Sequence, residues 1–147
     1  FLWMEADLLD AKEYDKWLQL WTGSGHYVIP VDKQGDDFAN TLNIAYDNAL
    51  MRDMRVKRLQ GGFSISAAPP AESVRTVSRI VIDSVEGSLI TVRAAQHVME
   101  DKFGRQRSFA MNVTWKLEQT EEGLKIHDKI IRLLNSDGML TSISYLF

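Results

Sequence analysis

The side chains best suited to acid–base or metal chemistry in this sequence are its three histidines, His26, His97 and His127. Histidine changes charge near neutral pH, and its neutral ring is a common metal ligand. A zinc or iron site built on histidine needs at least two converging ligands. None of the three has a second ligand-type side chain at an HxH or HxxxH spacing, and Asp128 would point away from His127 on a strand. We expect no metal in this chain unless distant segments converge.

His97 is the histidine with the most informative surroundings. On an extended strand it would share one face with Thr91, Arg93, Ala95 and Met99, while the opposite face is more apolar. A half-polar face of this kind would meet either a pocket or another subunit. We therefore expect a structural or interface histidine, with a general acid or base in a pocket as the alternative.

Tyr46 and Asp47 form a second candidate pair. At the mouth of a pocket, a tyrosine and an acid could donate a proton to a carbonyl substrate and take one from it. Asp47 also stands just before an expected helix, where its carboxylate would cap the free amides of the first turn. The sequence contains no GxSxG, HExxH, Walker-type or GxGxxG pattern. We expect no catalytic residue, and Tyr46, Asp47 and His97 are the alternative set if the chain is an enzyme.

Length and composition narrow the class of protein. The 147 residues predict one domain spanning residues 1–147. A net charge of −3 without a block of Lys or Arg argues against a nucleic-acid partner. The absence of cysteine removes disulfides, thiolate metal sites and cysteine-held iron–sulfur clusters, and it suits a reducing cytoplasm.

The sequence gives no indication of a membrane partner. No apolar run approaches the roughly 20 residues of a membrane span, and no signal peptide is visible. The chain opens at Phe1 without Met, so we expect that a short leader precedes it.

Helical patterns occupy two segments of the first half. Residues 2–21 have apolar side chains near helical spacing, and a break near residues 10–13 divides them into two short helices. Trp3, Trp17 and Trp21 are expected to pack on a sheet. Residues 26–31 read as a short strand that Pro30 restricts to an edge or a strand end, and residues 32–40 as a polar, mobile loop.

A second helix is expected over residues 48–60, because Gly61-Gly62 would end it. Its buried stripe would consist of the apolar residues Ala49, Leu50, Met54, Val56 and Leu59. Its cations are expected on a solvated face, or on a docking surface for an acidic partner. These cations are Arg52, Arg55, Lys57 and Arg58.

The second half of the chain predicts strands. Alternation of apolar and polar residues indicates strands over residues 74–83, 89–100, 108–118, 124–134 and 142–147. Glycine-containing turns separate most of them, and such short connections force antiparallel neighbours. The connector 63–73 contains Pro69-Pro70, which cannot continue a helix or join a ladder. Helices followed by strands predict an α+β fold, in which a long curved sheet curls into an open cone and the helices close one side around a pocket.

Short motifs along nearly the whole chain match one family pattern. The first are Glu5-Ala6-Asp7-Leu8-Leu9-Asp10, then Tyr14, Trp17, Leu18 and the strand from Tyr27 to Pro30. Tyr46-Asp47 follows, with Leu50, Arg55, Arg58, Leu59 and Gly61. The last are Pro69-Pro70 with Arg75, Val77 and Ser78, then Thr91-Val92-Arg93, Gly104-Arg105, Gly123-Leu124-Lys125-Ile126 and Ile143-Ser144-Tyr145-Leu146-Phe147. In order and spacing, the chain resembles the small (beta) subunits of aromatic-ring-hydroxylating dioxygenases.

This resemblance implies an NTF2-like cone, in which a curved mixed sheet wraps around helices. It also implies a homotrimer that carries three alpha subunits. The Rieske iron–sulfur cluster and the mononuclear iron would lie in the alpha subunit, with no cofactor in this chain. The beta subunit would be a non-catalytic, structural component of an oxidoreductase for aromatic compound catabolism.

Two departures from the family pattern fall in the connector. Phe63-Ser64-Ile65 stands where many members have Trp, and Ala71-Glu72-Ser73 separates the proline pair from Arg75. The main alternative is a stand-alone NTF2-like small-molecule binder, or an isomerase or dehydratase with a pocket inside the cone. The isomerase dyad is not carried over, because Ile29 and Glu5 occupy its places. A third possibility is an interaction domain whose cone is filled.

Overall fold

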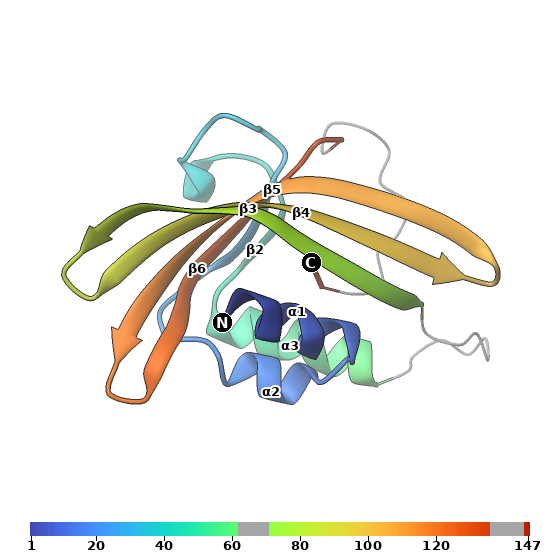
Figure 1. The fold of residues 1–147 in the computed structure, drawn as a ribbon, viewed down its shortest axis with the longest axis horizontal. Coiled ribbons are helices and arrows are strands. Elements are labelled where there is room, and N and C mark those ends of the chain that lie inside the picture. The colour runs from blue at the N-terminus through green and yellow to red at the C-terminus, as the bar shows by residue number, and fades with distance from the viewer. Residues whose placement is uncertain (62–70, 136–145) are drawn as a thin grey trace.

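The protein folds as a six-stranded curved sheet with its α-helices on one face (Figure 1). The computed structural model describes residues 1–61, 71–135 and 146–147. In chain order the elements are α1 (Leu2–Asp10), α2 (Tyr14–Leu18), β1 (Tyr27–Pro30), the 3-10 helix η1 (Phe38–Asn40), β2 (Asn43–Asp47), α3 (Ala49–Gln60), β3 (Glu72–Glu86), β4 (Leu89–Lys102), β5 (Arg105–Thr120) and β6 (Gly123–Leu133). The predicted α+β class, with a curved sheet against N-terminal helices, is confirmed.

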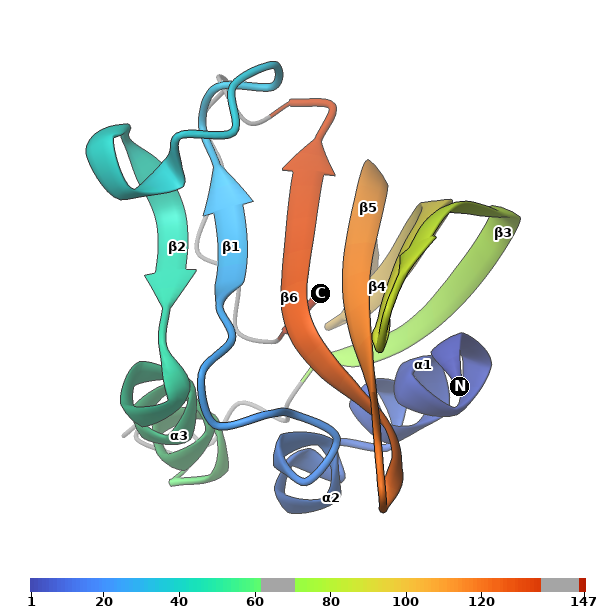
Figure 2. The ribbon, with the colours of Figure 1, turned by 90° about the vertical axis from the view of Figure 1, so that its left-hand side faces the viewer.

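The strand order is β2-β1-β6-β5-β4-β3, so the N-terminal hairpin lies beside the C-terminal strand (Figure 2). The long strands β3 to β6 are antiparallel neighbours joined by short turns. The turn Phe103-Gly104 has positive φ at both residues, 57° and 70°, as a two-residue hairpin with right-handed twist requires. β1 instead runs parallel to β6, pairing Tyr27 with Lys129. The sheet is therefore mixed.

Strand β2 was not expected from the sequence, and it changes the role of Asp47. Tyr46 and Asp47 pair with Val28 and Tyr27 of β1. The predicted helix cap at Asp47 is wrong, because Asp47 is the last residue of β2. The residue that caps α3 is Asn48. The Asn48 side chain accepts a hydrogen bond from the Met51 amide at 3.0 Å.

Helix α3 begins one residue later than predicted, at Ala49, ends at Gln60 as predicted, and buries a different face. Val56 is buried, whereas Leu50 and Met54 are 68% and 53% exposed, so the predicted apolar stripe is wrong at these two positions. The expected solvated position of Arg52 is also wrong. Its guanidinium is buried 4.0 Å from the centre of the Trp21 ring and donates to the Thr22 and Asp47 carbonyls at 3.2 and 3.3 Å. Arg52 fastens α3 to the segment that precedes β1.

The hydrophobic core lies between the inner face of the sheet and the helices. The predicted alternation in β5 is confirmed, since Phe109, Met111, Val113, Trp115 and Leu117 are all buried. From the helices, Trp17 and Trp21 join this core as expected. Trp3 does not, because it is 69% exposed and donates to the Val77 carbonyl at the edge of β3 at 3.2 Å.

Several predictions extend beyond what the structure describes. Most of the connector 63–73, including Pro69-Pro70, lies outside the described residues, and β3 begins at Glu72. The same is true of residues 142–145 of the last expected strand, whereas Leu146 and Phe147 are described and buried. In the described segments, no helix has both the length and the hydropathy to cross a membrane.

Candidate functional site: a filled cone and an outer-face pocket

The interior of the cone is occupied by a buried ion pair. The Lys129 ammonium donates to the Glu5 carboxylate at 2.7 Å, and the two side chains are 0% and 2% exposed. The indoles of Trp17 and Trp115 donate to the two oxygens of the same carboxylate, at 3.0 and 2.8 Å. Glu5 thus receives three donors from α2, β5 and β6. Such full satisfaction is what makes a buried charge tolerable.

The last residue of the chain completes this network. Lys129 also donates to the Phe147 carbonyl at 2.9 Å, and the Phe147 amide donates to the Tyr27 hydroxyl at 3.0 Å. Burial lowers the pKa of Lys129, and the Glu5 carboxylate opposes this shift. Burial raises the pKa of Tyr27, so its hydroxyl stays neutral. Among the described residues, packed and hydrogen-bonded side chains thus lie between the helices and the inner face of the sheet.

The three candidate catalytic residues do not come together. Asp47 faces the helices, where it is 2% exposed and accepts a hydrogen bond from Arg55 at 3.0 Å. Tyr46 faces the opposite side of the sheet, and its ring stacks on His26 with centroids 4.8 Å apart. His97 is exposed on β4, which three strands (β1, β6 and β5) separate from β2 in the sheet.

A pocket of about 510 Å³ lies on the outer face of the sheet, opposite the helices, and is called the outer pocket below. Its lining comes from β1, β2, β5, β6 and the loop that precedes β2. The lining residues are His26, Val28, Asp36, Phe38, Tyr46, Thr114, Lys116, Asp128, Ile130 and Arg132. Val28 and Ile130 form an apolar floor of low exposure, 2% and 5%.

The loop that holds η1 is tied down beside this floor. Arg132 of β6 donates to Asp36 at 2.6 Å and to the Gly35 carbonyl at 3.2 Å. Its guanidinium also lies 5.5 Å from the centre of the Phe38 ring. The side-chain amide of Asn43 donates a hydrogen bond to the Phe38 carbonyl at 2.7 Å. These contacts hold Phe38 and Asp36 at the pocket.

Asp128 is the central carboxylate of the outer pocket. It accepts from the His26 backbone amide at 3.0 Å and lies 3.6 Å from the Lys116 ammonium. The His26 ring nitrogen Nδ1 is 4.0 Å from the same carboxylate, which is longer than a hydrogen bond. The pair is therefore not arranged as an oriented general base. Among the described residues, no three His, Asp or Glu side chains gather as a metal site would require.

Comparison with known proteins decides the family. A family model for the ring hydroxylating beta subunit matches residues 4–137. The chain belongs to this family. It is 24% identical to the anthranilate 1,2-dioxygenase small subunit of Acinetobacter baylyi, over 92% of this chain and 86% of that protein. It is 25% identical to the N,N-dimethyl phenylurea N-demethylase subunit beta of a Sphingobium strain, over 98% and 82%.

Solved structures agree on the fold. The beta subunit of benzoate 1,2-dioxygenase from Burkholderia mallei superimposes with a TM-score of 0.82 at 23% identity, covering 99% of this chain and 92% of that one. Naphthalene 1,2-dioxygenase gives 0.72 at 17% identity, covering 90% and 74%. An NTF2-like protein with a cystatin-like fold from Novosphingobium aromaticivorans gives 0.60 at 16% identity, covering 91% and 77%. The family resemblance and the NTF2-like fold predicted from the sequence are confirmed.

Sequence reasoning missed both the buried ion pair and the outer pocket of this ring-hydroxylating beta subunit. The ion pair joins residues far apart in the chain, and a lone Glu or Lys gives no local signal of burial. The outer pocket depends on the parallel contact of β1 with β6, and no turn between them reveals it. One usable signal was present. His26, Val28, Asp128, Ile130 and Arg132 alternate along two predicted strands and therefore share one face of each.

Proposed function

We propose that this chain is the non-catalytic small subunit of an aromatic-ring-hydroxylating dioxygenase, and that residues 1–147 act as one structural domain. In this proposal it supports an alpha subunit that carries the Rieske cluster and the mononuclear iron. The alternative of an enzyme with a pocket inside the cone is not favoured. The observation that carries the proposal is the satisfied network that Glu5, Lys129, Trp17 and Trp115 form between the helices and the sheet.

The energetics of that network suit a scaffold. Charged groups that are removed from water lose the free energy of hydration. Only well-placed ionic and hydrogen-bond partners offset this loss. Each oxygen of Glu5 has a partner within 3.0 Å, and Lys129 has two acceptors. Breaking these contacts to admit a substrate would leave a buried charge without compensation. The interior is thus better suited to holding the helices against the sheet than to binding and releasing a ligand.

The surface is consistent with a subunit that assembles. Leu50, Met51 and Met54 on α3 are 68%, 45% and 53% exposed, and Val74, Ile82 and Val85 on β3 exceed 60%. The proposal expects these exposed apolar side chains to be buried where subunits meet, as contiguous apolar patches are in other assemblies. In this proposal the partners are copies of the same chain in a trimer and the alpha subunits above it. The assembly would be cytoplasmic.

Co-expression with a large (alpha) subunit of a ring-hydroxylating dioxygenase from the same organism tests the proposal. We expect the two chains to co-purify, native mass spectrometry to give equal numbers of each, and all iron to stay with the large chain when the two are separated. The large chain expressed alone should lose solubility or turnover. The proposal is overturned if the chains never co-purify and the turnover of the large chain is the same with and without this one.

A further inference from the structure

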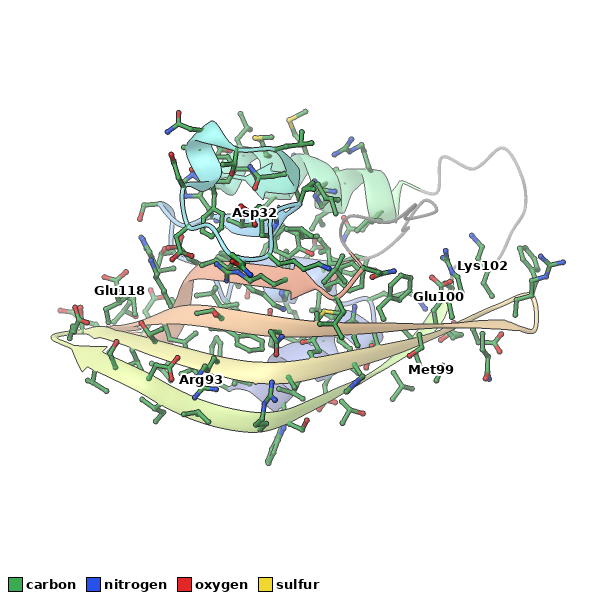
Figure 3. The ribbon with its side chains drawn as sticks, turned by 90° about the horizontal axis from the view of Figure 1, so that it is seen from above. Asp32, Arg93, Met99, Glu100, Lys102 and Glu118 are labelled. Carbon is green, nitrogen blue, oxygen red and sulfur yellow. The ribbon has the colours of Figure 1, made fainter. Side chains whose placement is uncertain are left out.

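Three guanidinium groups meet on the outer face of the sheet, next to the outer pocket. Arg79 of β3, Arg93 of β4 and Arg132 of β6 line one hollow of about 230 Å³. Asn112 and Thr114 of β5 lie between them in the same hollow. Figure 3 looks onto this face and labels Arg93, which lies on β4 next to the edge strand β3. None of these arginines belongs to the buried network of the cone.

The position of Arg79 is held by a local irregularity of β3. The pairing of β3 with β4 shifts register between Ser78 and Val81, and Arg79 has a φ of 53°. Positive φ is unfavourable for a residue with a side chain, and bulges often re-aim one side chain out of the strand pattern. Here the Arg79 side chain passes over β4 and donates to the Asn112 side chain of β5 at 2.8 Å. The bulge places a cation over the centre of the sheet.

Of the three arginines that line the hollow, two are paired with carboxylates in the described part of the chain and one is not. Arg93 pairs with Asp83 at 2.7 Å and Arg132 with Asp36 at 2.6 Å. Asp36 is itself 85% exposed, so water weakens its hold on Arg132. Arg79 has only the neutral Asn112 amide as a partner within the described residues. Arg79 and Arg93 each donate through a single nitrogen there, which leaves their other N–H groups for a ligand.

The arginine hollow continues into the outer pocket, because Thr114 and Arg132 line both. Beyond them lie the Phe38 ring, the apolar floor and the flat stack of His26 on Tyr46, whose ring planes differ by 8°. Within the described structure, neither the Tyr46 nor the Thr114 hydroxyl has a hydrogen-bond partner. One end of the combined groove thus carries aromatic rings and an apolar floor beside the charged side chains of Asp36, Lys116 and Asp128, and the other end carries the three arginines.

We propose that this groove binds a small planar aromatic acid. Its carboxylate is held by Arg79, Arg93 and Arg132, and its ring lies in the outer pocket against Phe38 and the His26–Tyr46 stack. Guanidinium groups match a planar carboxylate through paired, charge-assisted hydrogen bonds. A doubly charged phosphate fits less well, because Asp36 and Asp83 remain beside the same arginines. The volume of the outer pocket is within the range of small-ligand sites.

Titration of the purified full chain with benzoate, benzamide and inorganic phosphate tests the inference, with calorimetry and amide chemical shifts as readouts. Benzoate should bind saturably and shift the amides of Val28, Thr114 and Arg132. Benzamide, which has the same shape without the charge, should bind about 10-fold more weakly or worse, as loss of one charge-assisted contact predicts. Equal affinity for the two, or tighter binding of phosphate, would overturn the inference, as would no saturable benzoate binding.

Variants separate the two ends of the groove. Arg79→Gln and Arg93→Gln should each weaken benzoate about 10-fold and leave benzamide unchanged. Phe38→Ala should weaken both ligands. Arg105→Gln is the matched control, because Arg105 is an exposed arginine at the far end of β5 that lines neither hollow. Each variant is first checked for the thermal unfolding midpoint of the parent. If Arg79→Gln and Arg93→Gln retain full affinity, or if Arg105→Gln weakens benzoate equally, the site is not the one described.

Discussion

Lys129 and Glu5 form a 2.7 Å ion pair inside the cone although 124 residues separate them in the sequence. The pair joins the first helix to the last described strand, and two tryptophan indoles complete the coordination of the carboxylate. Because neither side chain is more than 2% exposed, removing one partner leaves the other charged and buried. The ion pair therefore stabilises the packing of α1 against β6.

Glu5→Gln should destabilise the fold by about 3–5 kcal/mol, since breaking a buried pair leaves its partner uncompensated. Gln has nearly the same size as Glu and keeps an acceptor for one indole. The loss of stability therefore measures the contribution of the negative charge. Urea unfolding followed by tryptophan fluorescence measures it. Glu121→Gln, at an exposed turn, is the control and should change stability by less than about 0.5 kcal/mol. Adding Lys129→Met to Glu5→Gln should recover part of the loss, and no recovery would argue against the charge as its cause.

Tyr27→Phe should have a pH-dependent effect. Near neutral pH the variant loses the acceptor for the buried Phe147 amide, which costs about 1–3 kcal/mol. Burial raises the pKa of Tyr27 in the folded protein above its usual value of 10.0. Above pH 10 the unfolded tyrosine ionises while the folded one does not, so its contribution to the free energy of unfolding falls as pH rises. The gap between parent and variant should therefore narrow from pH 9 to pH 11, as measured by urea unfolding at each pH. A constant gap would contradict this.

Gly25→Ala should be strongly destabilising, because an added Cβ would lie 1.3 Å from the His127 carbonyl oxygen of β6. Relief requires the segment before β1 to move away from β6, and we expect a loss of at least about 2 kcal/mol, the usual scale of overpacking. Gly23→Ala is the matched control two residues away, where a Cβ meets nothing within 4 Å. Thermal unfolding of both variants checks the difference. Similar unfolding midpoints for the two variants would show that Gly25 does not pack against the His127 carbonyl of β6.

His97→Ala should leave the turnover of the assembled dioxygenase unchanged, since the proposed function gives this exposed histidine no chemical role. Asp47→Asn should instead lower the unfolding midpoint, because the half-buried Arg55 loses its carboxylate. Its turnover per folded complex should remain that of the parent. The measurements are steady-state rates of the purified complex, together with calorimetric unfolding. A loss of turnover in both variants with unchanged stability would revive the catalytic alternative.

The sequence was most informative where a repeating pattern reports burial. The alternation of Phe109, Met111, Val113, Trp115 and Leu117 predicted β5, and glycine turns predicted its antiparallel neighbours. These features depend on residues close together in the chain, and their physical causes are local.

Features set by distant contacts were not predictable in this way. Asp47 and Asn48 are both good helix caps, and only the pairing of β2 with β1 assigns the role to Asn48. Arg52 resembles any surface cation of a helix until the carbonyls of Thr22 and Asp47 are placed beside it. The separation of the alternative catalytic residues Tyr46, Asp47 and His97 could not be predicted for the same reason. Its residues lie on strands whose order in the sheet is not their order in the sequence.

The parallel pairing of β1 with β6 also has a consequence for biosynthesis. β1 and β2 leave the ribosome early, but the strand they pair with spans Gly123–Leu133, near the end of the chain. Until that strand is translated, Tyr27 and Ile29 have no β6 neighbour to cover them, and the helices have no completed sheet to pack on. Contacts between residues so far apart in the sequence form slowly, and the partly folded intermediates are prone to aggregation. We therefore expect the nascent chain to be prone to aggregation until β6 has been translated.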